Sequence, residues 1–151
     1  MSSDELQQYL HDHIPLSRAM QIAVENISPE SVVLSAPLPP NINHRNTLFG
    51  GSASAVAILA AWSLLHTRLN GEGIASRLVI QRNTMSYDLP IDGACTAVSF
   101  LADSDEWPRF LRMLQRKGKA RIAVRAELHF NGQVAGRLEG EFVALGCKQT
   151  S

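Results

Sequence analysis

The stretch that decides the fold is LFGGSASAVAILAAWSLL, residues 48–65. It carries no charge over 18 residues, close to the ~20 residues that an apolar helix needs to span a bilayer. Glycines, serines and five alanines make it less hydrophobic than a leucine-rich span, so we expect a buried helix, with Ser52 as its N-cap, running to about Asn70. Its apolar side chains point in every direction around the axis, so the rest of the chain must wrap it.

The remaining sequence supplies this wrapping as strands. Alternating apolar and polar residues predict two strands before the helix and four after it. A capping-box spacing, Ser2-x-x-Glu5, predicts a short helix before Pro15, and a second short helix is closed by Arg116-Lys117-Gly118. The strands are expected at about residues 20–25, 32–36, 74–87, 93–102, 120–130 and 134–145. This order predicts an α+β fold in which one curved antiparallel β-sheet wraps around a central α-helix.

The last two strands form a hairpin whose register can be predicted. A two-residue turn at Asn131-Gly132 would pair Phe130 with Gln133 and mix the two faces of the hairpin. A three-residue connection, or an equivalent bulge, pairs Phe130 with Val134 and keeps the apolar faces together. We predict this second register, which also opposes residues of opposite charge, Glu127 with Arg137 and Arg125 with Glu139.

Composition limits the class of protein. The 151 residues, with 45% hydrophobic and 19% charged side chains, predict a single domain spanning residues 1–151. Fourteen basic residues balance fourteen acidic ones, so the chain has no global field for nucleic acid or an anionic membrane. Cys95 and Cys147 are far apart and match no metal-ligand spacing, which indicates reduced buried thiols, although a bridge between them stays open. With a polar, acidic N-terminus unlike a secretory signal, these features predict a cytoplasmic protein.

The polar loop before the long helix carries the candidate chemistry. The unpaired amides of Gly50, Gly51 and Ser52, at the positive end of a helix dipole, would form an oxyanion hole; the alternative is a simple loop-to-helix turn. Asn43 has an amide that would hold water or a carbonyl, with Asn46 or His44 assisting, although asparagine is also common in turns. Ser54 would orient water from the helix. The five histidines are scattered, so we expect no metal and no cofactor.

Several motifs in order resemble one known fold family. Asn43-x-x-x-Thr47-x-Phe49-Gly50-Gly51 and Tyr87-x-x-Pro90-Ile91 resemble the helix start and the following strand end of hotdog-fold acyl-CoA thioesterases. Pro40-Asn41-x-Asn43 and Gly118-Lys119-Ala120-Arg121 are similar to the thioesterase family found as the C-terminal domain of YiiD-type acetyltransferases. The resemblance covers about residues 14–145. It implies metal-free hydrolysis of an acyl-CoA or acyl-carrier thioester by a homodimer or homotetramer, because relatives build each site across two subunits.

The resemblance also assigns roles to residues. Gly50 and Gly51 would bind the oxyanion, and Asn43 would position water. The substrate would contact the residues around the helix start, the strand that relatives place near the dimer-related site, and a basic cluster suited to phosphates, namely Asn46, Phe49, Ser52, Ser54, Arg82, Asn83, Arg116, Lys117, Gly118 and Lys119. Alternatively, these basic residues form only the charged, solvent-exposed start of a strand. Phe49, Trp62 and Met85 would line an acyl tunnel or belong to the core.

Two departures from the family pattern keep other functions open. Phe49 stands where many relatives place histidine, and Ile58 stands about where they place an acid on the helix. Catalysis would therefore proceed without the usual carboxylate. A non-catalytic acyl-binding or CoA-binding module is the main alternative. A hydratase on the same fold is a third, but such enzymes usually need a histidine and an acid at these positions.

Overall fold

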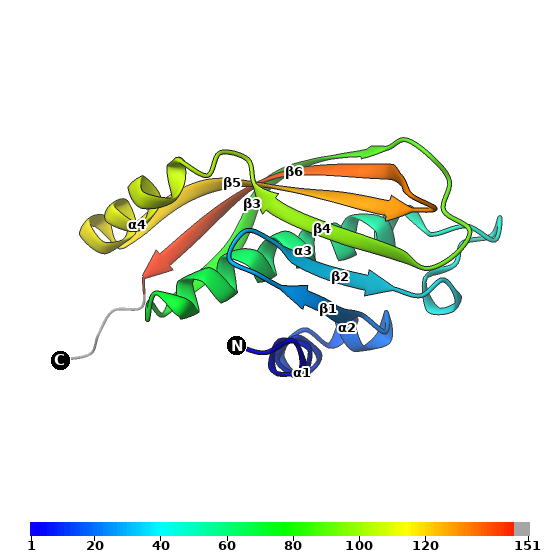
Figure 1. Cartoon of the computed structure of the whole chain (residues 1–151), viewed down its shortest axis with the longest axis horizontal. Coiled ribbons are helices and arrows are strands. Elements are labelled where there is room, and N and C mark those ends of the chain that lie inside the picture. The colour runs from blue at the N-terminus through cyan, green and yellow to red at the C-terminus, as the bar shows by residue number, and fades with distance from the viewer. Residues whose placement is uncertain (147–151) are drawn as a thin grey trace.

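The computed structural model describes residues 1–146. The described chain contains four α-helices, one short 3-10 helix, η1, and six strands (Figure 1). In chain order the elements are α1 (Ser3–His13), α2 (Pro15–Ala19), β1 (Ala23–Ile27), β2 (Val32–Ala36), η1 (Pro39–Asn41), α3 (Gly50–Gly71), β3 (Ser76–Tyr87), β4 (Cys95–Leu101), α4 (Glu106–Lys117), β5 (Lys119–Phe130) and β6 (Gln133–Gly146).

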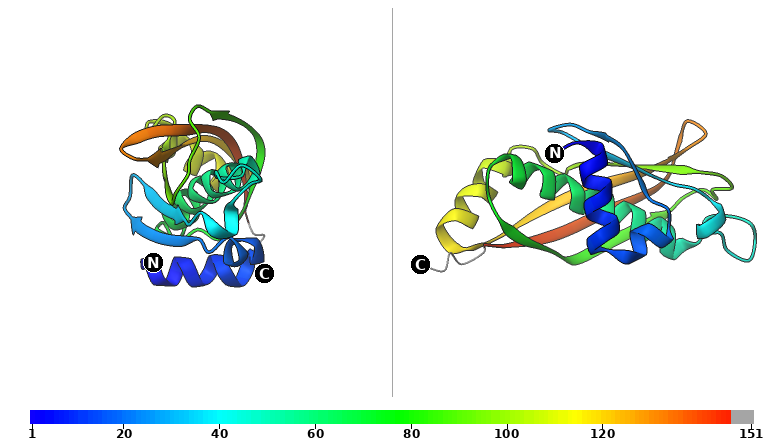
Figure 2. Two further views of the ribbon diagram at one scale, coloured as in Figure 1. Left: turned by 90° about the vertical axis from the view of Figure 1, so that its right-hand side faces the viewer. Right: turned by 90° about the horizontal axis from the view of Figure 1, so that it is seen from below.

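Six strands form one sheet in the order β1-β2-β4-β5-β6-β3, and each neighbouring pair is antiparallel. The sheet curves around α3, as Figures 1 and 2 show from three directions. Strands β2 to β6 all contact this helix. The predicted architecture, a curved antiparallel sheet around a central helix, is therefore confirmed.

Helix α3 was predicted to be buried on every side, and it is buried on most of them, while Ala55, Ile58 and Trp62 are only half-buried. Residues as far apart around its axis as Val56, Ala57, Ala61 and Leu64 are fully buried. The sheet covers one side of the helix, and α1 contributes Leu6 and Leu10 to the same core. Within residues 1–146, no helix has both the length and the apolar character that crossing a membrane requires.

Helix α1 also contacts α3 through aromatic rings. The ring centroids of Tyr9 and His66 lie 4.6 Å apart, and those of His66 and Trp62 lie 4.7 Å apart. The predicted capping box of α1 is present: the Ser2 hydroxyl accepts from the amide of Glu5, and the Glu5 carboxylate accepts from the amide of Ser2. Burial, together with the nearby His13, lowers the pKa of His66, because a charged imidazole would lose its hydration in this stack.

The N-terminal region departs from the prediction in one place. Pro15 does more than end the first helix, since it is the first residue of α2. A strand beginning at Met20 was predicted, and this is wrong: Met20 caps α2, Gln21 adopts a φ of 57°, and β1 begins at Ala23. A proline at the first position of a helix needs no amide partner, so it starts a helix as readily as it ends one.

The hairpin of β5 and β6 corrects the predicted turn. Phe130 lies opposite Gln133, so the prediction that it faces Val134 is wrong. Asn131 and Gly132 have φ values of 51° and 73°, as a two-residue turn with left-handed residues requires. A shift of register between Leu128 and His129 then restores the parity. Beyond that bulge the predicted pairs are confirmed, with Glu127 opposite Arg137 and Arg125 opposite Glu139.

The two ends of α3 face different surroundings. The guanidinium of Arg68, in the last turn of α3, lies 4.2 Å from the ring centre of Trp107 in α4. Helix α4 therefore lies at the C-terminal end of α3. The loop before α3 and the turn between β5 and β6 lie at the opposite end of the molecule (Figure 1). Strand β3 forms one edge of the sheet, and each of its 12 residues is exposed or half-buried.

Candidate active site

The loop from Asn41 to Phe49 is held against the rest of the fold at its end. The amide of Leu48 donates to the carbonyl of Ile91 at 2.7 Å, and the amide of Phe49 donates to the carbonyl of Asn41 at 2.8 Å. Ile42 and Leu48 form an isolated antiparallel bridge across the loop. These contacts fix the point at which the backbone enters α3.

Asn43 organises the interior of this loop. Its side-chain oxygen accepts from the amides of Arg45 at 2.8 Å and Thr47 at 3.1 Å. Its side-chain nitrogen donates to the Thr47 hydroxyl at 2.9 Å and, more weakly, to the Leu48 carbonyl at 3.4 Å. Asn46 adopts a left-handed φ of 64° at the exposed tip. The amide of Asn43 is thus fully engaged by the loop itself.

The first turn of α3 presents unpaired amides. The first backbone bond of the helix runs from the amide of Ala53 to the carbonyl of Phe49 at 2.9 Å. Within residues 1–146, the amides of Gly50, Gly51 and Ser52 donate to no backbone or side-chain acceptor. The first turn contains no acidic residue, so these amides lie at the uncompensated positive end of a 22-residue helix.

Phe49 is the N-cap residue of α3, so the prediction that Ser52 caps this helix is wrong. The helix begins two residues before Ser52, because Gly50 and Gly51 continue it without a capping side chain. Ser52 and Ser54 instead lie in the first two turns, half-buried. Ser52 carries one of the unpaired amides, and Ser54 lies two residues farther along the helix.

Two aromatic rings flank these glycines. An ideal Cβ built on Gly50 would lie 3.5 Å from Cε1 of Tyr87 and 4.0 Å from its hydroxyl oxygen. A Cβ built on Gly51 would overlap the ring of Phe49. Only glycine therefore leaves the amide of residue 51 beside this ring without displacing it. Phe49 is 56% exposed and Tyr87 is 60% exposed, so both rings border solvent.

A pocket of ≈ 310 Å³ opens beside Gly50. Its volume lies at the lower end of the range for small-molecule sites. Asp88 lines the pocket, and its carboxylate pairs with Arg137 at 3.0 Å. The other walls are mostly apolar and come from the start of α3, the segment after β3 and the hairpin, namely Leu48, Ala53, Leu89, Ile91, Leu128 and Ala135. An apolar acyl group fits these walls better than a charged one does.

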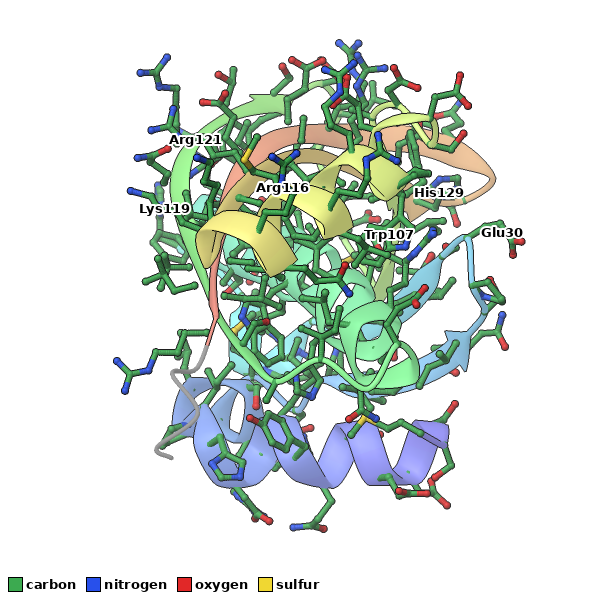
Figure 3. All side chains as sticks on the ribbon, turned by 90° about the vertical axis from the view of Figure 1, so that its left-hand side faces the viewer. Glu30, Trp107, Arg116, Lys119, Arg121 and His129 are labelled. Atoms are coloured by element: carbon green, nitrogen blue, oxygen red, sulfur yellow. The ribbon has the colours of Figure 1, made fainter. Side chains whose placement is uncertain are left out.

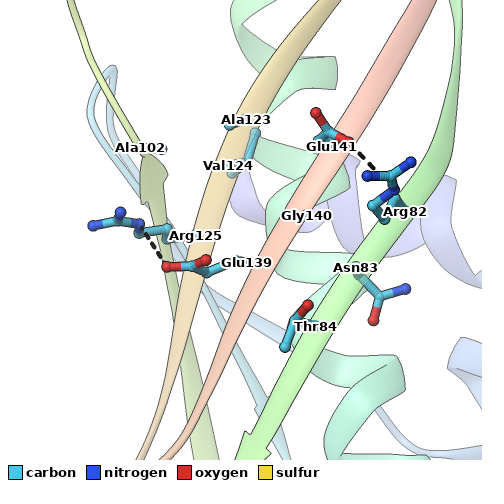
Figure 4. A pocket seen from close by; sticks show the side chains of 10 residues that line it. All are labelled: Arg82, Asn83, Thr84, Ala102, Ala123, Val124, Arg125, Glu139, Gly140 and Glu141. Atoms are coloured by element: carbon cyan, nitrogen blue, oxygen red, sulfur yellow. Dashed lines mark ion pairs between the residues drawn. The ribbon is translucent and has the colours of Figure 1, made fainter.

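Arg82 and Asn83 lie elsewhere, on the edge strand β3. Together with β5 and β6 they line a second hollow of ≈ 320 Å³ (Figure 4). Arg82 pairs with Glu141 at 3.8 Å, and Arg125 pairs with Glu139 at 3.5 Å. Because these pairs balance its charge, the hollow offers no net attraction to an anion. The structure does not bring Arg82 and Asn83 into the pocket beside Gly50.

The basic cluster lies at the far end of the molecule. Gly118 ends α4 with a φ of 72°, and its amide donates to the carbonyl of Leu114 at 2.9 Å. Arg116 and Lys119 are exposed at this end, with Arg121 beside them (Figure 3). Eighteen residues of helix, ~27 Å, separate the Gly50 end of α3 from Arg68, which contacts α4. Within one chain, Arg116, Lys117, Gly118 and Lys119 are not brought together with Gly50.

Other reactive side chains are poorly placed for chemistry at this pocket. His44 is exposed on the loop. Cys95 is buried in the core, and this burial raises the pKa of its thiol to about 11, so it is protonated near neutral pH. Cys147, and with it the open question of a bridge, lies outside the described residues. In residues 1–146, no three histidine, cysteine, aspartate or glutamate side chains converge as metal ligands.

With this geometry established, comparison with known proteins identifies the family. A family model described as "Putative thioesterase (yiiD_Cterm)" matches residues 3–146. The chain belongs to this family. The hotdog fold predicted from the sequence motifs is confirmed with it.

Solved structures agree over almost the whole chain. A Chlorobaculum tepidum protein of unknown function is 30% identical, with a TM-score of 0.91 over 96% of this chain and 94% of its own. A "putative thioesterase" from Shewanella oneidensis is 27% identical, with a TM-score of 0.85 over 95% of this chain and 96% of its own. A Pseudomonas aeruginosa protein described as a probable thioesterase shares the fold at 17% identity, with a TM-score of 0.83 over 97% of both chains.

Sequence reasoning missed one wall of the pocket. Tyr87, Pro90 and Ile91 were recognised as a family motif but were not assigned to the site. The motif ends β3 and continues past Gly50, which is 37 residues earlier in the chain. Met85, predicted for an acyl tunnel, packs near Gly136. Trp62 lies farther along α3 and donates from its indole nitrogen to the carbonyl of Leu78 at 3.2 Å.

Proposed function

We propose that this member of the thioesterase family hydrolyses acyl-CoA-type thioesters at the Gly50 end of α3. The observation that carries the proposal is the set of unpaired amides of Gly50, Gly51 and Ser52 beside an apolar pocket. Oriented backbone donors at a helix start stabilise negative charge as it develops. The pocket supplies an apolar surface for the acyl group, and the solvent side of the glycines leaves room for the thiol portion.

The proposed reaction uses the helix start and a water molecule. The thioester carbonyl oxygen accepts hydrogen bonds from the amides of Gly50 and Gly51. The water oxygen forms a bond to the carbonyl carbon, the C=O π electrons move to oxygen, and a tetrahedral oxyanion results. When the C=O bond reforms, the C–S bond breaks and its electrons leave with sulfur. The proton lost by water is balanced by the proton that the thiolate gains, which gives a carboxylic acid and a thiol.

Asn43 supports this reaction as a positioning residue. All four hydrogen bonds of its side-chain amide run within the loop that leads to Phe49 and Gly50. The original expectation, direct contact with the attacking water, would require one of these bonds to open. The pocket lining does not include Asn46, Phe49, Ser52 or Ser54. In this proposal they would contact the part of the substrate that lies outside the pocket. Displacement of catalytic groups by about 1 Å lowers rates by about 10²-fold.

A homodimer would bring the basic cluster to this site. Strand β3 runs from Ser76, which pairs with Gly146, to Tyr87 beside Gly50. Gly146 in turn donates its amide to the carbonyl of Gly118 at 2.8 Å. An antiparallel β3 pair related by a two-fold axis would therefore place the Ser76 and Gly118 end of one protomer beside the Tyr87 end of its partner. Long unpaired edge strands favour this kind of association.

In that arrangement the basic cluster of the partner protomer faces the thiol portion of the substrate. Arg116, Lys117 and Lys119 would bind the phosphates of CoA, with Gly118 allowing a close approach of the backbone. Arg82 and Asn83 on β3 would lie at the interface between protomers. The cytoplasmic location expected from the sequence remains part of this proposal, since acyl-CoA esters are its substrates.

The test is a panel of acyl-CoA thioesters of different chain length, assayed by release of free thiol. We expect the wild type to hydrolyse part of the panel and Asn43→Ala to lower kcat/KM by about 10²-fold. Asn70→Ala is the matched control, because Asn70 is exposed near the other end of α3 and should leave the rate unchanged. Absence of thiol release above the uncatalysed rate across the panel contradicts the proposal.

One observation favours a second candidate function, a non-catalytic acyl-binding or CoA-binding module. Helix α3 has no acidic residue anywhere from Gly50 to Gly71, so the carboxylate that would activate water is missing from it. Saturable binding of CoA esters, measured by calorimetry, with no thiol release would establish this alternative. Hydrolysis with a saturating rate would exclude it.

A further inference from the structure

Tyr87 places a hydroxyl group beside the start of α3. It is the last residue of β3 and lies opposite Gly136 of β6. Because neither Gly50 nor Gly136 has a side chain, the Tyr87 ring lies close to the helix start. The ring reaches within 3.5 Å of the Cβ position of Gly50, and the hydroxyl oxygen lies 4.0 Å from the same point.

The hydroxyl of Tyr87 has no hydrogen-bond partner among residues 1–146. Tyr87 is 60% exposed, and its ring lies beside Gly50 with the hydroxyl open to a ligand. The amides of Gly50 and Gly51 are likewise unpaired and lie at the same end of α3. Tyr87 and Gly50 both line the pocket, and Gly51 follows Gly50 in the first turn of α3.

We infer that the Tyr87 hydroxyl is a catalytic hydrogen-bond donor to the carbonyl oxygen of the thioester. This inference rests on the proposed hydrolysis. As the oxygen gains negative charge, the phenol donates to it together with the amides of Gly50 and Gly51, and it keeps its proton throughout. The bonds that form and break are therefore those of the hydrolysis itself. Donors aimed at developing charge stabilise the transition state more than they stabilise the bound substrate, and so they lower the barrier.

The charge of the first turn of α3 suits this role. A carboxylate in the first turn would repel the oxyanion, whereas this helix start has only donors and its dipole. The rings of Phe49 and Tyr87 lie next to Gly51 and Gly50, so a bound thioester would be enclosed between these rings and the helix start. Hydrogen bonds gain strength when competing water is removed.

The decisive variant is Tyr87→Phe, which keeps the ring against Gly50 and removes only the hydroxyl oxygen. On the best thioester of the panel, we expect kcat to fall by on the order of 10²-fold with KM changed less than about twofold, as for loss of a donor that acts mainly in the transition state. Tyr9→Phe is the matched control, because Tyr9 is the other tyrosine of the chain and lies on α1. Its kinetics should match the wild type.

The outcomes of this experiment test the role of Tyr87 separately from the proposed thioester hydrolysis. A wild type that hydrolyses thioesters and a Tyr87→Phe variant with kcat within twofold of it overturn the role of Tyr87 alone. A change confined to KM also overturns it, because it shows a contact with bound substrate without a contribution to the transition state. A wild type with no hydrolysis overturns both statements. Thermal melts of Tyr87→Phe and the wild type should coincide, which excludes unfolding as the cause of a lower rate.

Discussion

Replacing Gly50 with alanine separates the stability of α3 from the chemistry at its first turn. Gly50 does not have a positive φ, so alanine adopts the same backbone. The added Cβ would lie 3.5 Å from the Tyr87 ring, an ordinary van der Waals distance. A glycine-to-alanine change at a compatible site stabilises a protein by about 0.4–1 kcal/mol, chiefly by restricting the unfolded chain. For a chain of this size we expect Tm to rise by about 1–4 °C.

Activity should move in the opposite direction. The new methyl group occupies the space between the helix start and the Tyr87 hydroxyl, 4.0 Å from the hydroxyl oxygen. In the proposed reaction, a carbonyl oxygen bound to the Gly50 amide would need this space. Loss of one oxyanion donor costs about 10²–10³-fold in rate, or about 2.7–4 kcal/mol of transition-state stabilisation. We therefore expect kcat/KM of Gly50→Ala to fall by at least about 10²-fold.

The assay combines thiol release with thermal melting, and the same helix offers the control. Gly71 is the last residue of α3, and a Cβ built there meets nothing within 4 Å. Gly71→Ala should therefore be as stable as the wild type or more stable, with unchanged kinetics. A Gly50→Ala variant that keeps more than half of wild-type kcat/KM would refute the location of the site. A fall in its Tm would refute the packing argument.

Two further predictions concern stability alone. Because the pKa of His66 is lowered from 6.5 in the folded chain, the unfolded chain binds more protons, and the free energy of unfolding should fall as pH drops below ~6.5. Urea unfolding at pH 7.5 and 5.5 measures this dependence on pH. His66→Phe should reduce it, and an unchanged dependence would contradict the assignment to His66. Gly118→Ala should lower the free energy of unfolding by about 1–2 kcal/mol, because residue 118 has a φ of 72°, where a side chain strains the backbone. The added Cβ meets no neighbouring atom, so the backbone is the source of this strain. A Tm equal to that of Gly71→Ala would contradict the prediction.

The fold could be predicted because its signals are local in the sequence. The uncharged run at residues 48–65 identified the central helix, and strand alternation placed the sheet around it. The hairpin turn could not be predicted by the same reasoning, because parity along two strands is satisfied equally well by a longer turn or by a bulge farther along. The chain uses the bulge at Leu128 and His129, which allows the favourable Asn131-Gly132 turn and still opposes Arg125 to Glu139.

Only part of the candidate site could be predicted from the sequence. Unpaired amides at the start of a helix follow from the chain order, so Gly50 and Gly51 could be proposed from the sequence. Tyr87 comes near them only because β3 ends where α3 begins, and no periodicity encodes that meeting. Asn43 is a similar case, since only the loop geometry shows that its amide is already engaged.

The basic cluster shows that residues suited to bind a substrate need not lie near its reaction site in the same chain. Arg116, Lys117 and Lys119 suit phosphate chemically, yet α4 packs at the Arg68 end of α3, a helix length away from Gly50. The proposed homodimer would reconcile both facts. Strand β3 runs from the Gly118 end of the molecule to the Tyr87 end, so pairing it with an antiparallel β3 of a partner would place the Gly118 end of one protomer beside the Tyr87 end of the other. If charge reversal at Lys119 raises KM for CoA esters in a dimer but leaves short acyl thioesters without phosphates unaffected, the cluster acts from the partner protomer. An equal effect on both substrates would instead assign Lys119 to the stability of the β5 strand.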